Sequence, residues 1–373
     1  MSDTVTPQRP RRRFTAVTTV ALAGLLAVTA TGCGPDGGPA GADGKGGTIT
    51  FGISTPTMTA NFVALAVGKE EGFFADEGLK VDDVFLKDSG TVLQAMAGGK
   101  VDIGTPTPDV AFAAMDQGQD VKLIYNWARR PVAAFSVLDT SPITTVRDLA
   151  GRTIGVQSIS AGTTTLAKAS LTQAGVDVNR VKFVEVGLGA PALDALQRGR
   201  VDTVVQYDAQ SSAQISAGAK LRLISPEGVE DLFATTFVSS SAFLTSNSAA
   251  VKGFGRAWSK ASVWALANPE AAIRIMWKLY PASKTGDGDK AMQNALAIFK
   301  ARMDSAVNVD DVTAKKIWGQ YDESAVQHWL DFAHQNGITK SSLKTSDVYT
   351  NADVPDYNNF DAAAIQKAAA EAK

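Results

Sequence analysis

The sequence predicts an α/β protein with two lobes, in which mixed sheets are flanked by helices and a helical segment forms the C-terminal part. Three observations predict it. Short β-rich runs alternate with helical runs between residues 48 and 206, which is typical of βαβ units with mainly parallel strands. A ten-residue pattern recurs 100 residues further along the chain. The 373 residues are more than one hydrophobic core usually serves.

The alternating elements form two successive sets. The first set has strands predicted at residues 48–53, 79–85, 101–103 and 121–125, with helices at 62–71, 91–97 and 111–117. The second set has strands predicted at residues 153–156, 181–186 and 201–206, with helices at 164–174 and 190–197.

The internal repeat supports a duplicated architecture. LQAMAGGKVD at residues 93–102 and LDALQRGRVD at residues 193–202 share the pattern L-x-A-[ML]-x-x-G-[KR]-V-D. In each copy a helix ends at a Gly, with a cation beside its C-terminal end, before a buried strand. Any helix–Gly–strand corner resembles this pattern, but the matching order of the neighbouring elements favours duplication.

Two extended, β-rich segments at residues 132–138 and 235–244 flank the second set. We expect them to cross between the lobes as a hinge, which assigns residues 48–134 plus 236–373 to lobe 1 and residues 135–235 to lobe 2. The remaining helices are predicted at residues 249–267, 269–279, 290–303, 309–336 and 362–373.

The first 32 residues are typical of an export signal. A cationic start is followed by an uncharged apolar run at residues 15–31 that ends in small residues. ATGC at residues 30–33 resembles the lipobox of bacterial lipoproteins, with Ala30 where Leu is usual. It predicts a lipid on the Cys33 thiol, and an ordinary signal peptide followed by a free thiol is the alternative. The Arg11–Arg12 pair also fits a twin-arginine signal.

Residues 33–47, rich in Gly, Pro and Asp, predict a flexible tether. Because Cys33 is the single cysteine, no internal disulfide is expected. Without residues 1–32 the formal charge changes from −2 to −5, which argues against a nucleic-acid partner. No second apolar stretch approaches membrane-spanning length, so we expect a protein anchored on the extracytoplasmic face of the cell membrane.

Three stretches resemble one family. KEEGFFADEGLKV at residues 69–81 contains G-[FY]-F-x-x-x-G-[LI]-x-V, and AMAGGKVDIG at residues 95–104 and DLAGRTIGV at residues 148–156 follow at the expected distances. They resemble the nitrate/sulfonate/taurine and pyrimidine-precursor group of ABC-transporter substrate-binding proteins. The resemblance covers residues 48–224 well and the helical tail loosely.

This resemblance implies a type II periplasmic-binding fold, whose two lobes close around a small solute. It implies a monomeric component that delivers its solute to a permease and its ATPase, with neither catalysis nor a cofactor. The same fold hosts the pyrimidine synthases of thiamine biosynthesis, whose Cys-rich motif is absent here. An exported sensor domain of the same fold is a third class.

Polar loops that follow strands indicate the solute site, because helix N-termini present unpaired N–H groups at the carboxyl ends of strands. The chain has such loops at residues 54–61, 104–109 and 157–164, and around Gly187 and residues 206–208. The predicted ligand-binding residues are Thr57, Asn61, Thr105, Trp127, Ser158, Ser160, Gly162, Thr163, Thr164, Gly187, Tyr207 and Asp208.

The loop at residues 157–164 is the most polar of these loops. Gly162 allows close backbone approach, and the hydroxyls of Ser160, Thr163 and Thr164 suit an oxyanion or a heterocycle. The alternative is a solvated cluster of helix caps, and at least one hydroxyl is expected to be only a cap. In the second loop Thr107 is expected to cap a helix, which leaves Thr105 freer to face the cleft.

The ligand class stays open at this point. Hydroxyl-rich helix N-termini suit a sulfonate, nitrate or taurine-like anion, and Arg129 or Arg130 is a candidate anion partner. Tyr207 and Trp127 suit a flat ring, and Asp208 suits an amine or ring N–H, although packing, hinge and capping roles are equally open. The anion class is slightly favoured.

Other chemistries find little support. His328 and His334 are six residues apart, on different helix faces, so no metal site is expected. The serine run at residues 239–241 lacks the G-x-S-x-G pattern of hydrolases. Residues 186–192 imitate a dinucleotide fingerprint only with Ala in place of its last Gly. The five tryptophans after Trp127 fall in helical stretches and are expected to pack in the core.

Overall fold

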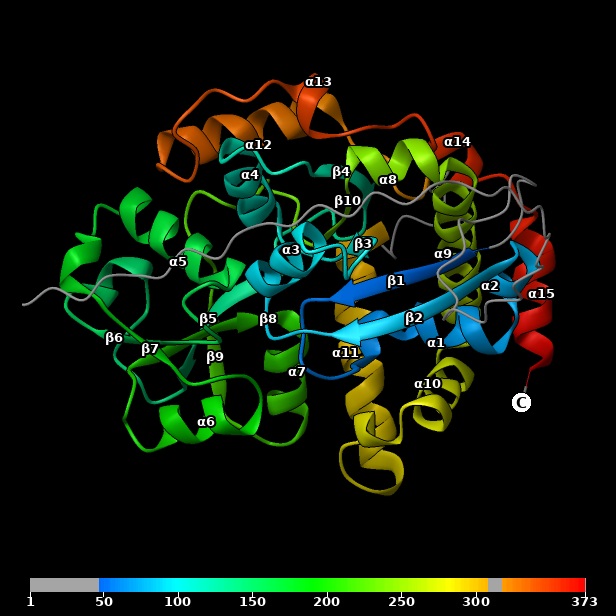
Figure 1. Ribbon diagram of the computed structural model, residues 1–373. Coiled ribbons are helices and arrows are strands. Elements are labelled where there is room, and N and C mark those ends of the chain that lie inside the picture. The colour runs from blue at the N-terminus through cyan, green and yellow to red at the C-terminus, as the bar shows by residue number, and fades with distance from the viewer. Residues whose placement is uncertain (1–46, 308–316, 373) are drawn as a thin grey trace, which may run out of the picture. The chain divides into compact units, whose positions relative to one another are not determined.

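The computed structural model describes residues 47–307 and 317–372. The predicted export signal, Cys33, and all of the predicted tether except its last residue lie outside these ranges. Two five-stranded mixed sheets organise the described residues (Figure 1). We call the sheet that contains the first strand sheet A and the other sheet B, and we use lobe 1 and lobe 2 for the parts built around them.

Sheet A has the order β2 (Leu79–Phe85), β1 (Gly47–Ile53), β3 (Ile103–Gly104), β10 (Thr236–Ser239) and β4 (Lys122–Asn126). β1 pairs in parallel with β2 and β3. β10 is antiparallel to both β3 and β4, with an irregularity in register between Phe237 and Val238.

Sheet B has the order β7 (Lys182–Glu185), β6 (Thr153–Val156), β8 (Thr203–Tyr207), β5 (Ala133–Leu138) and β9 (Leu221–Ile224). β6 is parallel to β7 and β8, whereas β5 is antiparallel to β8 and β9. In each sheet one antiparallel strand, β10 or β5, therefore occupies the fourth place. The strands of sheet A lie within the residues predicted for lobe 1 except for Gly47, which was assigned to the tether, and those of sheet B begin two residues before the predicted start of lobe 2.

The internal repeat has the same structural role in both lobes. Gly99 and Gly199 both have positive φ, of 67° and 66°, and each ends a helix as the sequence predicts. The carboxylate of Asp102 then accepts a hydrogen bond from the backbone N–H of Thr50, at 2.7 Å. The carboxylate of Asp202 accepts the equivalent bond from Thr153, at 2.8 Å. Each aspartate thus joins the third parallel strand of its sheet to the first.

Helices cover both faces of sheet A. One face packs against α1, α2, α9, α10, α11, α14 and α15, and the other packs against α3, α4 and α12. Their bounds are Val63–Glu70, Phe73–Asp76, Ser248–Ala267, Pro269–Leu279, Gly288–Val307, Val354–Tyr357 and Ala362–Glu371 for the first face, and Ser89–Ala97, Pro108–Asp116 and Glu323–Gln335 for the second.

Sheet B is covered by α5 (Gly162–Gln173) on one face and α6 (Ala190–Gln197) on the other. α7 (Asp208–Ser216) follows β8, and α8 (Ser241–Ser246) follows β10. The remaining short helices are α13 (Thr345–Val348) and the 3-10 turns η1 (Ala60–Phe62), η2 (Val146–Leu149), η3 (Val178–Arg180) and η4 (Pro281–Ser283).

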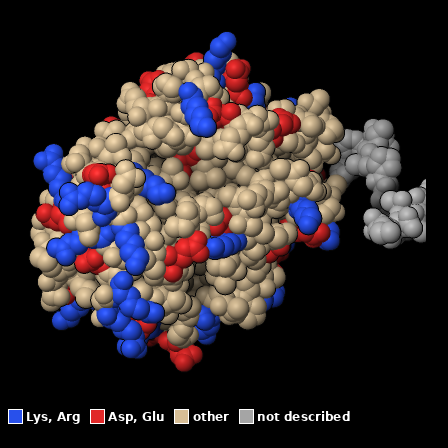
Figure 2. All heavy atoms as spheres, turned by 60° about the vertical axis from the view of Figure 1, so that its left-hand side comes forward, with Lys and Arg blue, Asp and Glu red and all other residues tan. Residues whose placement is uncertain are grey.

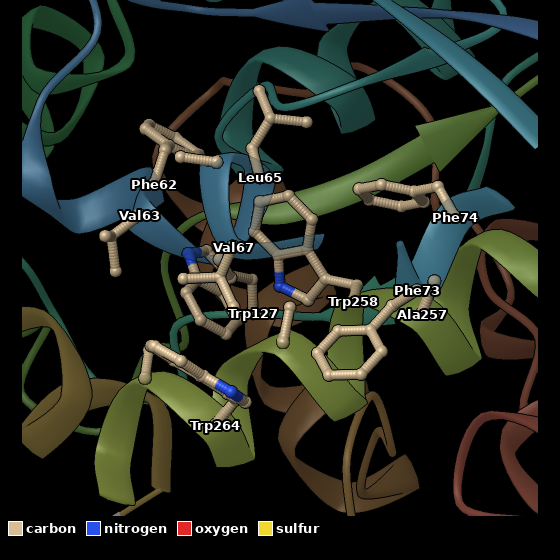
Figure 3. Packing of buried hydrophobic residues seen from close by; sticks show 14 of the residues in the cluster. Phe62, Val63, Leu65, Val67, Phe73, Phe74, Trp127, Ala257, Trp258 and Trp264 are labelled. Carbon is tan, nitrogen blue, oxygen red and sulfur yellow. The ribbon is translucent and has the colours of Figure 1, made fainter. Parts of the chain in front are cut away.

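An aromatic cluster forms the centre of the core beside sheet A (Figure 3). The ring of Phe237 lies 4.8 Å from that of Trp258 and 5.1 Å from that of Tyr125, measured between ring centroids. Trp127 meets Trp258 edge-on at 5.3 Å. The predicted core role is confirmed for Trp258, Trp264, Trp318 and Trp329, which are buried, while Trp277 is partly buried against the same core.

Two predictions about local structure are wrong. The segment predicted as extended at residues 235–244 ends as a strand at Ser239, because the Ser240 hydroxyl accepts a hydrogen bond from the Phe243 N–H and starts α8. The helix predicted at residues 309–336 lies partly outside the described residues. Where it is described, Gly319 forms a bridge with Asn126 of β4, and the helix begins only at Glu323.

On the face of the molecule shown in Figure 2, acidic and basic side chains are interspersed. Several ion pairs in the described chain are exposed, such as Arg274 with Glu270 at 2.7 Å, and such pairs contribute little to stability. No helix within the described ranges is both long enough and apolar enough to cross a bilayer.

The repeat yields a test of the duplicated plan. We expect Asp102→Ala and Asp202→Ala each to lower the free energy of unfolding by about 1–2 kcal/mol, because each leaves one strand N–H without its acceptor. Urea unfolding measures both. Asp82→Ala is the control, since Asp82 pairs only with Lys80 on the surface and should change stability by less than about 0.5 kcal/mol. A loss confined to one of the two aspartates would contradict the equivalence.

Candidate functional site

The loops that follow the parallel strands of the two sheets meet one another. The loop after β2 reaches the loop after β6, and α4 of lobe 1 packs against α5 of lobe 2. The predicted loop at residues 157–164 therefore lies at the contact between lobes, where the carboxyl ends of strands and the N-termini of helices from both lobes come together.

Asp88 is the most heavily hydrogen-bonded group at this contact. One carboxylate oxygen accepts from the hydroxyls of Ser158 at 2.5 Å and Ser160 at 2.8 Å, both in lobe 2. The other accepts from the N–H and the hydroxyl of Thr91, at 2.8 and 2.9 Å, and so caps α3. Asp88 is 1% exposed. Burial alone would raise its pKa, but the bonds from Ser158, Thr91 and Ser160 outweigh burial and lower it.

Two further contacts join the same loops. The side-chain amide of Gln157 donates to the backbone carbonyl of Lys87. The Lys87 ammonium pairs with Glu185 at 3.3 Å, and Glu185 also accepts from the Ile159 N–H at 2.9 Å. The outer rim of the contact is thus an exposed ion pair, whereas its inner part is the buried Asp88 cluster.

Gly162 sits where the N-termini of α4 and α5 approach each other. A Cβ atom at Gly162 would lie 1.8 Å from the hydroxyl oxygen of Thr107, a distance that no side chain tolerates. The close approach predicted for Gly162 is therefore made, in this structure, to the neighbouring lobe. Thr107 holds the N-cap position of α4, but its side chain makes no capping bond.

Asp109, two residues after Thr107, is a buried carboxylate whose nearby donors in the described chain, the hydroxyls of Thr107 and Thr165 and the backbone N–H groups of Asp109 and Val110, are poorly aligned for hydrogen bonding. It lies in the first turn of α4, and it is 0% exposed. Neither of its side-chain oxygens accepts a hydrogen bond of normal geometry from residues 47–307 or 317–372. Burial raises its pKa from 3.8 to about 6, and the nearby hydroxyls of Thr107 and Thr165 offset only part of that effect.

Tyr207 and Asp208, which end β8 and begin α7, are placed beside these acids. Tyr207 is buried, and burial raises its pKa above the usual range, with Asp109 as the next contributor. One oxygen of Asp208 accepts from the guanidinium of Arg302 at 3.0 Å, and the other has no partner among the described residues. Burial raises the pKa of Asp208, and Arg302 offsets part of it.

The loop after β1 supports the site from lobe 1. The Ser54 N–H and hydroxyl bond to Thr105, at 3.0 Å to its hydroxyl and 2.7 Å to its carbonyl. Thr105 is therefore occupied in joining two loops. Asn61 is buried and accepts from the Thr59 hydroxyl, while Thr57 is exposed.

The other predicted ligand-binding residues occupy different surroundings. The Thr164 hydroxyl donates to the Ser158 carbonyl at 2.7 Å and so stabilises its own turn, whereas the buried Thr163 hydroxyl has no partner in the described ranges. Gly187 has φ of 73° and is partly buried after β7. Trp127 is 1% exposed and belongs to the aromatic core, so its role as a wall of the solute site stays a prediction.

Three residues of the site were missed from the sequence. Asp88 stands before Ser89-Gly90-Thr91, a visible helix-cap signal that gives no hint of an interlobe contact. Asp109 follows Pro108 in a loop where only the threonines were predicted to have a role. Arg302 gave no signal, since it is one of many cations in the helical tail. The part of the chain that is described holds no group of three or more His, Cys, Asp or Glu side chains placed for a metal ion.

Comparison with solved structures identifies the class of this fold. The alkanesulfonate-binding protein SsuA from Xanthomonas axonopodis superposes with a TM-score of 0.63 at 16% identity, over 82% of this chain and 99% of that one. The fold is therefore the type II periplasmic-binding fold, as predicted, with two mixed sheets flanked by helices and a helical C-terminal segment. At this identity the likeness concerns the fold alone.

The family follows from the sequence. The model of the family described as NMT1/THI5 like matches residues 59–272, which is more than half of the chain, and this chain belongs to that family. The resemblance drawn from residues 69–81, 95–104 and 148–156 is thereby confirmed.

Three curated relatives show the breadth of this family. A riboflavin-binding protein from Chloroflexus aurantiacus is 25% identical over 79% of this chain and 82% of its own length. A formylaminopyrimidine-binding protein from Halalkalibacterium halodurans is 25% identical over 59% and 67%. A 4-amino-5-hydroxymethyl-2-methylpyrimidine phosphate synthase from Legionella pneumophila is 23% identical over 66% and 77%. Two of the three are named as binding proteins and one as an enzyme.

The burial of Asp109 leads to a prediction about the stability of the protein without bound solute. Its pKa of about 6 in the folded state exceeds its ordinary value, so the folded state favours the protonated form, and stability is lost as pH rises from about 4 to 6. We expect Asp109→Asn to raise the free energy of unfolding by about 2 kcal/mol at pH 7.5 and to change it little at pH 4.

Chemical denaturation at the two pH values measures this difference. Asp289→Asn is the matched control, because Asp289 also lies in the first turn of a helix but is exposed, and it should show no such pH dependence. A variant that is no more stable than the unmodified protein at pH 7.5 would mean that Asp109 has a partner in solution.

Proposed function

We propose that this protein is the extracytoplasmic solute-binding component of an ABC importer and that its solute is a nitrogen heterocycle with N–H donors, of pyrimidine or flavin type. In this proposal a lipid on Cys33 tethers a monomer to the cell membrane. Lobe 1 comprises residues 48–134 and 236–373, and lobe 2 comprises residues 135–235. The closed lobes present the solute to a permease and its ATPase, without catalysis.

The observation that carries the solute class is the carboxylate of Asp109. It is fully buried at the contact between the lobes and has two oxygens without partners in the described chain. A buried acceptor of this kind is costly unless a donor reaches it. A ring N–H or an exocyclic amine supplies such a donor, and Tyr207 and the free oxygen of Asp208 extend the same polar surface.

An anionic solute fits these residues less well. Asp88, Asp109 and Asp208 bring three acidic side chains to one region, and Arg302 is already paired with Asp208. An oxyanion placed among them would meet repulsion that is strong in a poorly solvated site. The sequence slightly favoured sulfonate, nitrate or taurine-like anions because of hydroxyls at helix N-termini. The described hydroxyls of Ser158, Ser160 and Thr164 bond to protein groups instead.

The relatives support the same choice. Two of them are named for binding riboflavin and formylaminopyrimidine, both of which are nitrogen heterocycles with N–H groups. The relative named as a synthase acts in pyrimidine chemistry, so an enzyme of that kind is the second candidate. The enzyme alternative predicts that a product forms, whereas a binding protein releases its solute unchanged.

A binding screen tests the solute class. We expect riboflavin or an aminopyrimidine to raise the melting temperature of the purified protein by a few degrees, since saturation at 100 Kd adds about 2.7 kcal/mol. Calorimetry at several pH values should show heterocycle affinity falling about tenfold per unit below pH 6, as Asp109 takes up a proton.

Alkanesulfonate, taurine and nitrate serve as the opposing arm of the same screen. Affinity for an anion would instead rise as pH falls, and tight anion binding alone would overturn the heterocycle proposal. Mass spectrometry of the incubated heterocycle distinguishes an enzyme from a binding protein, because an enzyme would convert the heterocycle to a product of different mass.

Gly162→Ala tests closure of the two lobes. The added methyl would overlap the Thr107 hydroxyl, so we expect the lobes to stay apart and the solute affinity to fall at least about tenfold. Ultracentrifugation or small-angle scattering reports the separation. Thr107→Ala in the same chain removes the overlapping oxygen and should restore part of the affinity. Ala161→Gly, at the adjacent N-cap position, is the control for backbone effects alone. Unchanged affinity in Gly162→Ala would exclude this contact from the bound form.

A further inference from the structure

The helix α11 borders the proposed solute site, although its residues lie beyond the part of the chain that the family model matches. The family model ends at residue 272, whereas α11 spans Gly288–Val307. It runs beside α7, which begins with Asp208 in lobe 2 (Figure 1). It also packs against η1, which contains Asn61 in lobe 1. One helix of the C-terminal segment thus contacts segments of both lobes that border the site.

Arg302 is the residue of α11 that reaches the site. It is 2% exposed. Its guanidinium donates to a carboxylate oxygen of Asp208 at 3.0 Å and to the hydroxyl of Thr235 at 3.1 Å. Its third nitrogen, Nε, and the second oxygen of Asp208 are both buried without partners in the described chain. Asp208 is the one carboxylate within ion-pair distance of Arg302 among the residues that the structure describes.

The same turn of α11 is bonded to both crossings between the sheets. Thr235, which receives the Arg302 bond, ends the return crossing at residues 225–235 just before β10, and its carbonyl accepts from the N–H of Ala128 at 2.8 Å. Ser305, one turn along, accepts at its carbonyl from the N–H of Arg129 in the first crossing, at 2.9 Å. The N–H of Asp208 itself donates to Val132 in that crossing, at 2.6 Å.

We propose that Arg302 is a positioning residue of the solute site, which holds Asp208 ionised and correctly oriented toward the solute while it fastens α11 to both crossings of the hinge. This inference rests on the proposed function. Arg302 acts through Asp208, and the solute class it selects is again a heterocycle that donates an N–H.

Electrostatics explain why Asp208 needs such a partner. Burial raises the pKa of Asp208, and the charge and hydrogen bond of Arg302 oppose that effect. Tyr207, next to Asp208 in the chain, is influenced by the charges of Asp109, Arg302 and Asp88. Arg302 is the charged group that acts on Asp208 itself. Without Arg302 the Asp208 carboxyl would take up a proton more readily and would then present an O–H donor where the solute requires an acceptor.

Four variants separate positioning from a purely structural role. Arg302→Met keeps an unbranched apolar stem and removes the charge, and Arg302→Lys keeps the charge but not the planar fork. Arg302→Met with Asp208→Asn neutralises both partners and remains informative if Arg302→Met alone fails to fold. Arg274→Met is the control, because Arg274 is an exposed helical arginine that pairs only with Glu270.

The first readout is affinity for riboflavin and for 4-amino-5-hydroxymethyl-2-methylpyrimidine, measured by calorimetry between pH 5 and 8. For whichever probe the unmodified protein binds, we expect Arg302→Met to weaken binding about tenfold or more and to shift the pH at which affinity is lost upward. Arg302→Lys should be intermediate. The double variant should regain stability but not affinity.

The second readout needs no solute. Hydrogen exchange at the N–H groups of Asp208 and Arg129 should become faster in Arg302→Met, because both bonds lie at the hinge that α11 fastens. The melting temperature of Arg302→Met relative to the unmodified protein should fall as pH rises above the ordinary pKa of an aspartate, about 4, since the folded pKa of Asp208 is raised further. The double variant should lack that slope.

The two readouts allow the inference about Arg302 and the proposed function to be tested separately. If the unmodified protein binds neither probe, the proposed function fails, and exchange and the pH slope alone then decide on Arg302. Unchanged exchange and an unchanged pH profile in Arg302→Met would overturn the inference. Faster exchange with unaltered affinity would also overturn it, because Arg302 would then support the hinge without positioning a solute group.

Discussion

The contact between the two lobes brings carboxylates out of water, and the structure meets that cost in three different ways. Asp88 accepts four hydrogen bonds, so its charge is well stabilised. Asp208 is paired with the guanidinium of Arg302. Asp109 has no ion-pair partner and no well-aligned hydrogen bond in the described chain, and the nearby hydroxyls of Thr107 and Thr165 offset its burial only in part. Since an unpaired buried charge is among the most expensive features a fold can contain, Asp109 is where a bound solute would contribute most.

Closure of the lobes depends on the same groups. The hydroxyls of Ser158 and Ser160 belong to lobe 2, and their acceptor Asp88 belongs to lobe 1, so these bonds form only when the lobes meet. Gly162 allows the approach because it has no side chain to meet Thr107. The hinge bonds at Val132 and Thr235 lie close to Asp208. In the proposed function, solute binding and lobe closure share residues, which is the arrangement that a domain-closure mechanism requires.

Fold and solute are determined by different parts of this molecule. The likeness to a sulfonate-binding protein at 16% identity reflects the sheets and their helices, which many solute-binding proteins share. The solute class depends on which side chains line the contact, and here they are acidic, aromatic and hydroxyl-bearing. The helical C-terminal segment adds Arg302 from a region that the family model does not cover. Specificity in such a fold can thus be supplied by segments added to the common core.

The sequence by itself determined the fold class, because the periods of strands and helices are local properties of the chain. The strands at Leu79–Phe85 and Thr153–Val156 have the predicted bounds. The repeated L-x-A-[ML]-x-x-G-[KR]-V-D pattern marks the same strand-joining aspartate in each sheet. The polar turn around Ser158 and Gly162 was also found from its residue types alone.

Only the tertiary structure decided which polar groups meet. Asp88 and Ser158 are 70 residues apart, and Asp208 and Arg302 are 94 residues apart, so no local pattern links them. Burial of Asp109 likewise arises from the packing of α4 against α5, two helices from different lobes. Hydrogen-bond partners and desolvation depend on distance in space, and a sequence read residue by residue records only distance along the chain.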